Sequence, residues 1–236
     1  MAEKPKSADI SPGPGFMIRR SAPRPDPKIV ESLREFYSAD VSDMLNRMYT
    51  MGSNIRNLIN AEPLVGPACT VKVYPGDNLM IHRVLDIAKP GDIVVVDTCG
   101  NTSHAVIGDL VSAKAKHRGI AGFVIDGLIR DQDDMKEIGL PVYARGVTPM
   151  GPLHRGPGEI NYSVSCGGVV VNSGDIIVAD NDGVVVVRQE YAADILARLQ
   201  KNKDRMDDYV AAVRRGVFSN DWVTEALADA GCIEND

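Results

Sequence analysis

The sequence lacks the closely spaced cysteines and histidines that bind structural zinc or build disulfide frameworks. Its four cysteines, Cys69, Cys99, Cys166 and Cys232, lie far apart and include no CxxC pair. This spacing argues against a zinc knuckle and a disulfide scaffold, so a reducing compartment fits the chain best. The four histidines form no HxH or HExxH pattern, which also argues against a zinc cluster.

Positive charge and long apolar segments are scarce as well. The 236 residues carry a net charge of −6, with a pI of about 5.3, so a basic surface that binds nucleic acid is not expected. Residues 1–27 are polar and rich in proline, without the apolar stretch of a secretory signal or a membrane anchor. We expect a flexible N-terminal arm over 1–27, a cytoplasmic protein, and neither nucleic acid nor membrane as a partner.

The chain does contain enough apolar residues, 44%, for a sizeable core. Its length allows one domain or at most two. Apolar spacing predicts two short helices over 29–49, followed by strands and helices in turn. The predicted strands are 69–74, 93–97, 122–126 and 140–144, and the predicted helices between them are 78–88, 105–117 and 131–138. This alternation is typical of an α/β domain.

The pattern changes after residue 149. Three short segments rich in valine and isoleucine follow, joined by glycine turns without a helix between them, at 169–171, 176–179 and 184–187. Their pairing is therefore expected to be local and antiparallel. Residues 190–215 have the apolar spacing of a long amphipathic helix, and a last helix is expected over 221–230. These two helices are poor candidates for the core.

The segment 108–134 carries the most chemical information. Arg130 and Asp131 come soon after a buried strand and its glycine turn at Gly127, and Asp109 lies near a helix start one strand earlier. Strand ends in open α/β sheets are places where ligands bind. A guanidinium can bind a carboxylate through two parallel hydrogen bonds, and an aspartate can hold a hard divalent cation. The segment therefore indicates a site for a metal-bound oxo acid.

Each of these residues also has a structural interpretation. Arg130 and Asp131 can form a surface ion pair, typically worth about 0–1 kcal/mol. Asp109 can be an acid that the helix dipole favours. Lys114 is expected on a solvated helix face, and His82, on an apolar helix face, is expected to pack against the core.

Four motifs occur in the order found in a known family. They are Gly76–His82, Gly108–Leu110, Ile125–Gly127 with Arg130-Asp131-x-x-Asp134, and Ala179–Val184. With these motifs the chain resembles the 4-hydroxy-4-methyl-2-oxoglutarate aldolases, class II pyruvate aldolases of the RraA-like superfamily. The resemblance implies a three-layer α/β domain of the β/β/α swivelling type, with mixed sheets and flanking N- and C-terminal helices. It also implies a catalytic core over 28–188, and C-terminal helices over 189–236 that make oligomer contacts in a homotrimer or homohexamer.

The resemblance implies roles for individual residues. Asp131 corresponds to the aspartate that binds the metal, Mg²⁺ or Mn²⁺, and Arg130 to the arginine that holds pyruvate and steadies the enolate oxygen. Asp109 would position a metal-bound water. A carboxylate from the neighbouring subunit is implied too, with Asp207 and Asp208 as candidates. Backbone groups at the helix start would bind the pyruvate carboxylate; they belong to Gly108, Leu110 and Val111.

These roles imply a metal-dependent aldolase that cleaves 4-hydroxy-4-methyl-2-oxoglutarate, or a related 4-hydroxy-2-oxo acid, to pyruvate and an oxo acid. Decarboxylation of oxaloacetate would follow because it leaves the same enolate. Arg145, Arg155 and the loop 147–161 are candidates for binding a distal carboxylate. Two alternatives stay open. One is a non-catalytic RraA-like regulator that binds an RNA-processing enzyme, although such regulators tend to lack the aspartate after the arginine. The other is a related lyase or hydratase that acts on another hydroxy acid.

Overall fold

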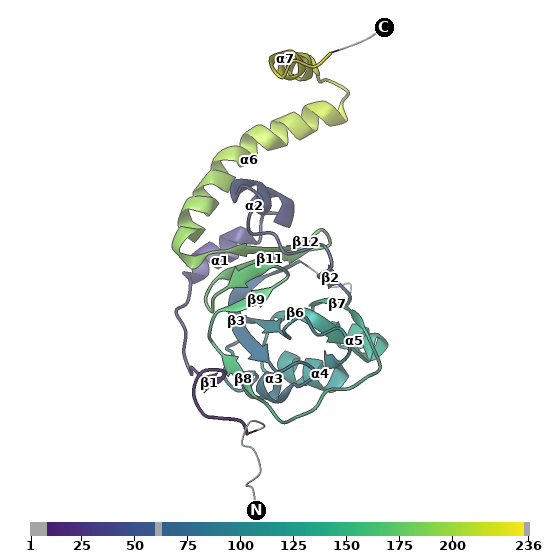
Figure 1. The fold of residues 1–236 in the computed structure, drawn as a ribbon. Coiled ribbons are helices and arrows are strands. Elements are labelled where there is room, and N and C mark those ends of the chain that lie inside the picture. The colour runs from purple at the N-terminus through teal and green to yellow at the C-terminus, as the bar shows by residue number, and fades with distance from the viewer. Residues whose placement is uncertain (1–8, 60–62, 234–236) are drawn as a thin grey trace, which may run out of the picture. The chain divides into compact units, whose positions relative to one another are not determined.

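The computed structural model describes residues 9–59 and 63–233, and the chain divides into two compact units, 1–196 and 197–236. The first unit contains all the strands (Figure 1). The second holds most of α6 (Ala192–Arg214) and all of α7 (Asp221–Asp229). In the part of the chain that the structure describes, no helix is long and apolar enough to cross a membrane.

Four parallel strands form the centre of the first unit. In spatial order they are β3 (Leu64–Val73), β4 (Ile93–Asp97), β6 (Gly122–Ile129) and β7 (Val142–Val147). Three helices lie in the connections between these strands. They are α3 (Leu79–Val84), α4 (Asp109–His117) and α5 (Gln132–Ile138). The predicted alternation of strand and helix is confirmed.

Shorter strands extend this centre on both edges. At one edge β8 (Gly158–Ile160) pairs antiparallel with β3, and at the other β2 (Arg56–Asn57) pairs antiparallel with β7. Strand β5 (Ala105–Ile107) lies parallel to the end of β6. The local antiparallel pairing expected after residue 149 is confirmed in two hairpins. They are β9 (Val164–Cys166) with β10 (Val169–Val171), and β11 (Ile176–Asp180) with β12 (Gly183–Val187).

The core has two parts, one on each face of the central sheet. Strand β4 is buried along its whole length, and its side chains alternate between the two. Val94 and Val96 pack in the cluster that includes helix residues such as Ala115, whereas Ile93 and Val95 pack in the cluster that includes the hairpin strands. Figure 1 shows α3, α4 and α5 on one side of the sheet and β9, β11 and β12 on the other. The predicted three-layer β/β/α arrangement is therefore confirmed.

The predicted helix over 105–117 is wrong at its start. Residues 105–107 form β5, which is fully buried and pairs with β6, and the helix begins only at Asp109. Gly108 lies between them with an extended backbone, at φ −144°. Three consecutive buried apolar residues need partners on both faces, which a strand inside the sheet supplies and the start of a surface helix does not.

Strand β6 is longer than predicted, because Gly127 lies inside it rather than in a turn. The strand runs to Ile129, with an irregular register against β7 between Ile125 and Leu128. A Cβ at position 127 would lie 2.7 Å from Thr98 Cγ2, so the glycine permits a close approach between neighbouring segments. The strand end, and with it Arg130, therefore lies further along the sheet than the sequence suggests.

The N-terminal segment contributes to the same unit. The two helices predicted over 29–49 are confirmed as α1 (Pro27–Leu33) and α2 (Ser38–Met44). Where the sequence analysis expects a flexible arm over 1–27, the structure places Phe16–Ile18 as β1, parallel to β8. Residues 1–8 of the predicted arm lie outside the described residues. The assignment of 28–188 to catalysis and of 189–236 to oligomer contacts stays a prediction.

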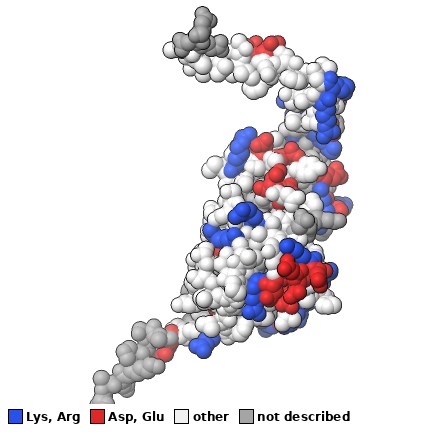
Figure 2. All heavy atoms as spheres, turned by 90° about the vertical axis from the view of Figure 1, so that its right-hand side faces the viewer, with Lys and Arg blue, Asp and Glu red and all other residues white. Residues whose placement is uncertain are grey.

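The surface carries charges of both signs. On the face that Figure 2 draws, acidic side chains gather in a cluster with lysines and arginines beside it. Helix α5 lies on that side in Figure 1, and its Asp133, Asp134 and Glu137 are exposed. This face offers no continuous basic surface to a nucleic-acid backbone.

Candidate active site

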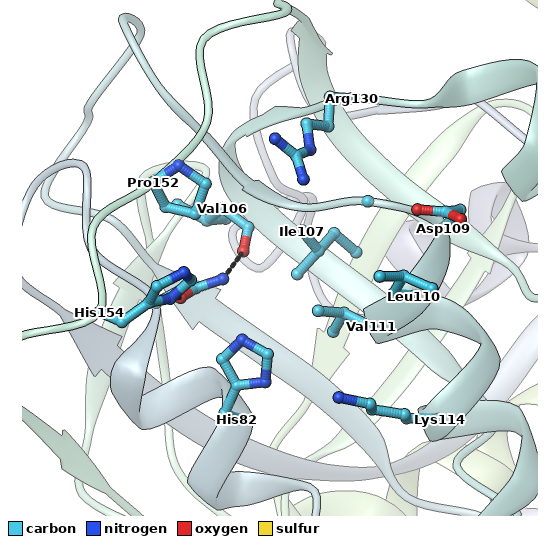
Figure 3. Close-up of a pocket in the computed structure, with 12 residues that line it drawn as sticks. His82, Val106, Ile107, Asp109, Leu110, Val111, Lys114, Arg130, Pro152 and His154 are labelled. Carbon is cyan, nitrogen blue, oxygen red and sulfur yellow. Dashed lines mark hydrogen bonds between the residues drawn. The ribbon is translucent and has the colours of Figure 1, made fainter.

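A pocket of about 260 Å³ opens beside the N-terminus of α4 (Figure 3). Its lining comes from several segments of the chain: the turn before α3 and α3 itself, β5 and Gly108, α4 from Asp109 to Lys114, the residue after β6, and the loop 152–154. The sheet brings these segments together because β5 pairs beside the end of β6. The pocket thus lies at a strand end, where the sequence analysis expects a ligand site.

Arg130 and Asp131 lie together at the end of β6. The Arg130 backbone N–H donates to the Ile107 carbonyl at 3.1 Å, which fixes the strand end against β5. The Arg130 Nε lies 3.1 Å from Asp131 Oδ2, and both side chains remain partly exposed, at 42% and 34%. Arg130 lines the pocket. The predicted pair therefore exists, and Arg130 belongs to the pocket lining whereas Asp131 does not.

Asp131 adopts an unusual backbone conformation. Its φ is 54° and its ψ 41°, in the left-handed region, directly before the first residue of α5. Residues other than glycine enter this region at some cost, and aspartate tolerates it better than most. Such conformations often occur at functional sites. This turn directs the aspartate side chain back toward Gly108, where an added Cβ would overlap Asp131 Oδ2.

The start of α4 supplies the other part of the predicted site. Gly108 is the N-cap and Asp109 the first helical residue, and both line the pocket together with Leu110 and Val111. Leu110 is 67% exposed, whereas Val111 is buried. The first N–H groups of a helix have no acceptor within it and form the positive end of its dipole. The structure thus brings together all the predicted pyruvate-binding residues at a place suited to a carboxylate.

Two pocket residues were assigned other roles by the sequence analysis. Lys114 is exposed, as predicted, but it faces the pocket, and His82 lines the pocket rather than only packing on the core. The pKa of His82 is lowered, first by burial and then by the positive groups of Lys114 and His154. Lys114 follows Val111 by three residues, so the two lie on the same face of the helix. This spacing is a sign in the sequence that Lys114 lies on the side of the predicted site.

The sequence analysis missed Asn78 and His154. Asn78 is buried and directly precedes α3, but its side chain does not cap the helix. Asp77 Oδ1 instead accepts a hydrogen bond from the N–H of Leu79, at 2.8 Å. The Asn78 side chain instead donates from Nδ2 to the Val106 carbonyl at 2.9 Å, and its Oδ1 lies 2.6 Å from His154 Nδ1. No local signal relates residue 78 to residue 154, because only the fold places the loop 152–154 beside α3.

The site contains few groups that could bind a metal directly. Among the described residues, no three His, Cys, Asp or Glu side chains group as metal ligands do. Magnesium nevertheless keeps several waters and often takes only one or two protein carboxylates. Asp131 is partly exposed, and its carboxylate packs against Gly108, which has room for it because the glycine lacks a Cβ. These residues therefore fit a hydrated divalent ion.

Other candidate residues lie elsewhere. The Arg145 Nε donates to the buried carboxylate of Asp126, and the role of Arg145 in binding a distal carboxylate stays a prediction. Arg155 is exposed in the loop, and its backbone N–H donates to Asp77 Oδ2 at 2.5 Å. Asp207 and Asp208 belong to the second unit. Asp207 pairs there with a lysine of the same helix at 3.1 Å, and the role of both aspartates in a neighbouring subunit stays a prediction.

The chain is similar to several known proteins. A protein of Halalkalibacterium halodurans named "Putative 4-hydroxy-4-methyl-2-oxoglutarate aldolase" is 38% identical over 174 residues, covering 74% of this chain and 83% of that protein. Among solved structures, an unusual Streptomyces coelicolor member of the RNase ES inhibitor RraA family matches with a TM-score of 0.72 and 29% identity, covering 80% of this chain and 99% of the other.

The RNA-processing inhibitor RraA from Thermus thermophilis matches with a TM-score of 0.60 and 26% identity, covering 64% of this chain and 92% of that one. The sequence model of the RraA-like family, described as Aldolase/RraA, matches residues 38–186, which include every residue of the pocket. The chain therefore belongs to the RraA-like family.

Proposed function

We propose that the protein is a divalent-metal-dependent aldolase that cleaves 4-hydroxy-4-methyl-2-oxoglutarate, or a related 4-hydroxy-2-oxo acid, to pyruvate and an oxo acid. The observation that carries the proposal is the position of Arg130. Its guanidinium lines the pocket beside the positive start of α4 and is paired with Asp131 at 3.1 Å. Two sources of positive potential thus face the same space, which suits an anion on which further negative charge develops.

The cleavage breaks the bond between C3 and C4 of the substrate. The C4 hydroxyl loses its proton and becomes the carbonyl of the departing oxo acid, while the electron pair stays on C3 as the enolate of pyruvate. The guanidinium of Arg130 donates to the C2 oxygen, where the negative charge develops. The N–H groups of Leu110 and Val111 hold the pyruvate carboxylate, and Asp109 orients the water through which protons move.

Asp131 would hold the metal, Mg²⁺ or Mn²⁺. When bound, the ion supplies Lewis-acid stabilisation of negative charge on the 2-oxo oxygen. The protein would contribute the carboxylate, its backbone conformation and, at Gly108, the room that this carboxylate occupies beside the helix start. Decarboxylation of oxaloacetate belongs to the same proposal, since loss of carbon dioxide leaves the same enolate.

Release of pyruvate from a panel of 4-hydroxy-2-oxo acids tests the proposal. We expect turnover with Mg²⁺ or Mn²⁺, its loss with a chelator and its recovery when the metal is restored. Pyruvate release from oxaloacetate should show the same metal dependence. Absence of metal-stimulated pyruvate release from every substrate of the panel would contradict the proposed aldolase.

Two substitutions test the residues. Arg130→Ala and Asp131→Ala should each abolish turnover, while the melting temperature stays close to that of the unaltered protein because both side chains are partly exposed. Asp133→Ala is the matched control, since its carboxylate, two residues away, is 99% exposed and pairs only loosely with Lys136 at 3.6 Å. Full activity in either site variant would refute the assignment.

A regulator of RNA processing is the second candidate, because one solved relative is described as the RNA-processing inhibitor RraA and another as an unusual member of the RNase ES inhibitor RraA family. The aspartate that follows Arg130 favours the enzyme, since a protein that only binds a partner does not need a carboxylate behind an arginine in a small-molecule pocket. We also propose that the chain assembles as a homotrimer or homohexamer.

A further inference from the structure

The pocket has a second group of basic side chains, away from Arg130. In Figure 3, Arg130 lies at one end of the pocket, and Lys114 and His82 lie at the other, with Ile107 and Val111 between them. The Lys114 amino group points toward His82, and His154 lies on the other side of His82. The rings of His82 and His154 meet edge to face, with centroids 5.6 Å apart. The pocket therefore has two separate positive ends joined by an apolar wall.

Lys114 has a different environment from the next lysine along its helix. Lys116 donates to the carbonyl of Ile138 across the helix layer. For Lys114, no carboxylate among the described residues lies within 4.0 Å of its amino group, and the single acid in the pocket lining, Asp109, is at the start of the helix, more than a turn away. An ammonium group that faces a pocket without a counter-ion is suited to bind an anion there.

The turn before α3 holds His154 in place. The Asn78 amide donates from Nδ2 to the Val106 carbonyl, so its Oδ1 must face His154, whose Nδ1 then carries the hydrogen. The loop is fixed as well, since Asn78 N donates to the Leu153 carbonyl at 2.9 Å, and Leu153 N to the Gly76 carbonyl at 2.8 Å. This end of the pocket is therefore preorganised, which lowers the cost of binding.

The electrostatics agree with the geometry. Burial lowers the pKa of His82, and so do the nearby charges of Lys114 and His154. The positive potential that disfavours a proton on His82 equally favours an anion placed between these groups. A carboxylate that leaves water for a pocket needs such partners, because an unpaired buried charge is costly.

We propose that Lys114, supported by His82 and His154, binds a second carboxylate of the substrate, located on the fragment that leaves as the oxo acid. Resting on the proposed aldolase function, this makes Lys114 the residue that determines preference for dianionic over monoanionic 4-hydroxy-2-oxo acids. The pyruvate portion binds at the Arg130 end, and the portion beyond C4 extends along Ile107 and Val111 to the lysine.

Kinetics with two substrates test this role. The dianion 4-hydroxy-4-methyl-2-oxoglutarate is compared with 4-hydroxy-2-oxopentanoate, which has no second carboxylate. Lys114→Met should lower kcat/KM for the dianion about 10-fold, mainly through KM, as expected for the loss of one charge-assisted hydrogen bond, and should leave the monoanion nearly unchanged. Lys114→Arg should largely restore the preference, because it restores the positive charge.

Lys116→Met is the matched control. Both lysines are exposed in the last turn of α4, where a positive charge interacts favourably with the helix dipole. Lys116→Met should change kcat/KM for neither substrate. If Lys114→Met lowers kcat/KM equally for both substrates, or for neither, the proposal is wrong. Equal loss would assign Lys114 a general structural role.

Binding separates this proposal from the aldolase activity itself. Titration calorimetry in the presence of Mg²⁺ measures the affinity of the protein for two compounds. Pyruvate would occupy one end of the pocket, and 2-oxoglutarate carries a second carboxylate. Lys114→Met should weaken the binding of 2-oxoglutarate about 10-fold and leave the binding of pyruvate unchanged, whether or not the protein turns over any substrate. If the unaltered protein binds pyruvate but prefers it to 2-oxoglutarate, the second carboxylate site is refuted, while the aldolase proposal stands.

Discussion

Gly108 shows how a single residue can matter through the side chain that it lacks. Its backbone is extended, so the conformation does not require glycine. An added Cβ, however, would overlap Asp131 Oδ2 and lie 3.1 Å from Arg130 Cγ. The glycine thus permits the close approach of the helix start to the arginine and the aspartate, beside which we place the metal and the oxo acid.

Gly108→Ala should therefore reduce activity without unfolding the protein. We expect a loss of about 100-fold in kcat/KM, the scale associated with misplacing catalytic groups by about 1 Å, and a melting temperature within a few degrees of the unaltered protein. Gly146→Ala is the control, because its Cβ would meet only Leu128 Cδ2 at an ordinary 3.5 Å. Unchanged turnover in Gly108→Ala would contradict this account of the site.

The cysteines should differ sharply in reactivity. Burial raises the pKa of Cys69 to about 12, with Asp92 adding to the effect, and raises that of Cys166 well above its usual value. Cys232 is exposed. Because the thiolate is the reactive form, iodoacetamide at pH 8 should modify Cys232 in the folded protein, and Cys69 and Cys166 only after unfolding. Intact-mass and peptide-mass spectrometry measure this, and rapid modification of Cys166 in the folded state would contradict it.

At the scale of secondary structure, the site depends on where β6 ends and α5 begins. The strand carries Arg130 to the pocket, and the left-handed residue Asp131 turns the chain directly into the helix. A glycine would adopt that conformation without strain, yet would supply no carboxylate. The aspartate at this position therefore costs some stability, as we expect if its carboxylate has the proposed role.

A pair of substitutions separates these two effects. Asp131→Gly relieves the left-handed strain, whereas Asp131→Ala retains it, so the glycine variant should be more stable than the alanine variant by about 1 kcal/mol. Both should lack metal-dependent turnover. Urea unfolding monitored by circular dichroism gives the comparison. Equal stability of the two variants would show that the backbone at this position is not strained in solution.

At the scale of the whole molecule, the two units differ in how they bury apolar residues. Both core clusters consist of residues 51–186, entirely within the first unit. The second unit exposes several large apolar side chains, which include Met206, Tyr209, Phe218 and Trp222. Exposed apolar groups of this kind commonly mark surfaces that contact other proteins, and we relate them to the proposed oligomer.

A chain that ends at Asn202 should therefore remain folded but assemble less. We expect cooperative thermal unfolding, because the core is complete without the last helices. The full-length chain should have a solution mass that is a multiple of 25.5 kDa, and the shortened chain a smaller assembly, both measured by light scattering after size-exclusion chromatography. An unchanged assembly would contradict the assignment of 189–236 to oligomer contacts.

The sequence alone determined the α/β alternation, the buried central strands and the grouping of Gly108, Asp109, Arg130 and Asp131. These follow from local patterns, since runs of valine and isoleucine form buried strands, and the motif residues lie within one strand–helix–strand segment. The strand β5, which the sequence analysis assigned to a helix, and the exact end of β6 did not follow, because pairing partners rather than local preference decide where a buried strand forms and stops.

Only the tertiary structure decided what else lines the pocket. Asn78, Lys114 and His154 come from three separate segments, and each has an ordinary local interpretation as a cap, a surface lysine or a loop histidine. Their meeting depends on how β5 pairs beside β6 and on the hydrogen bonds that hold the loop 152–154 to the turn before α3. Such contacts depend on the path of the whole chain, so no window of the sequence contains them.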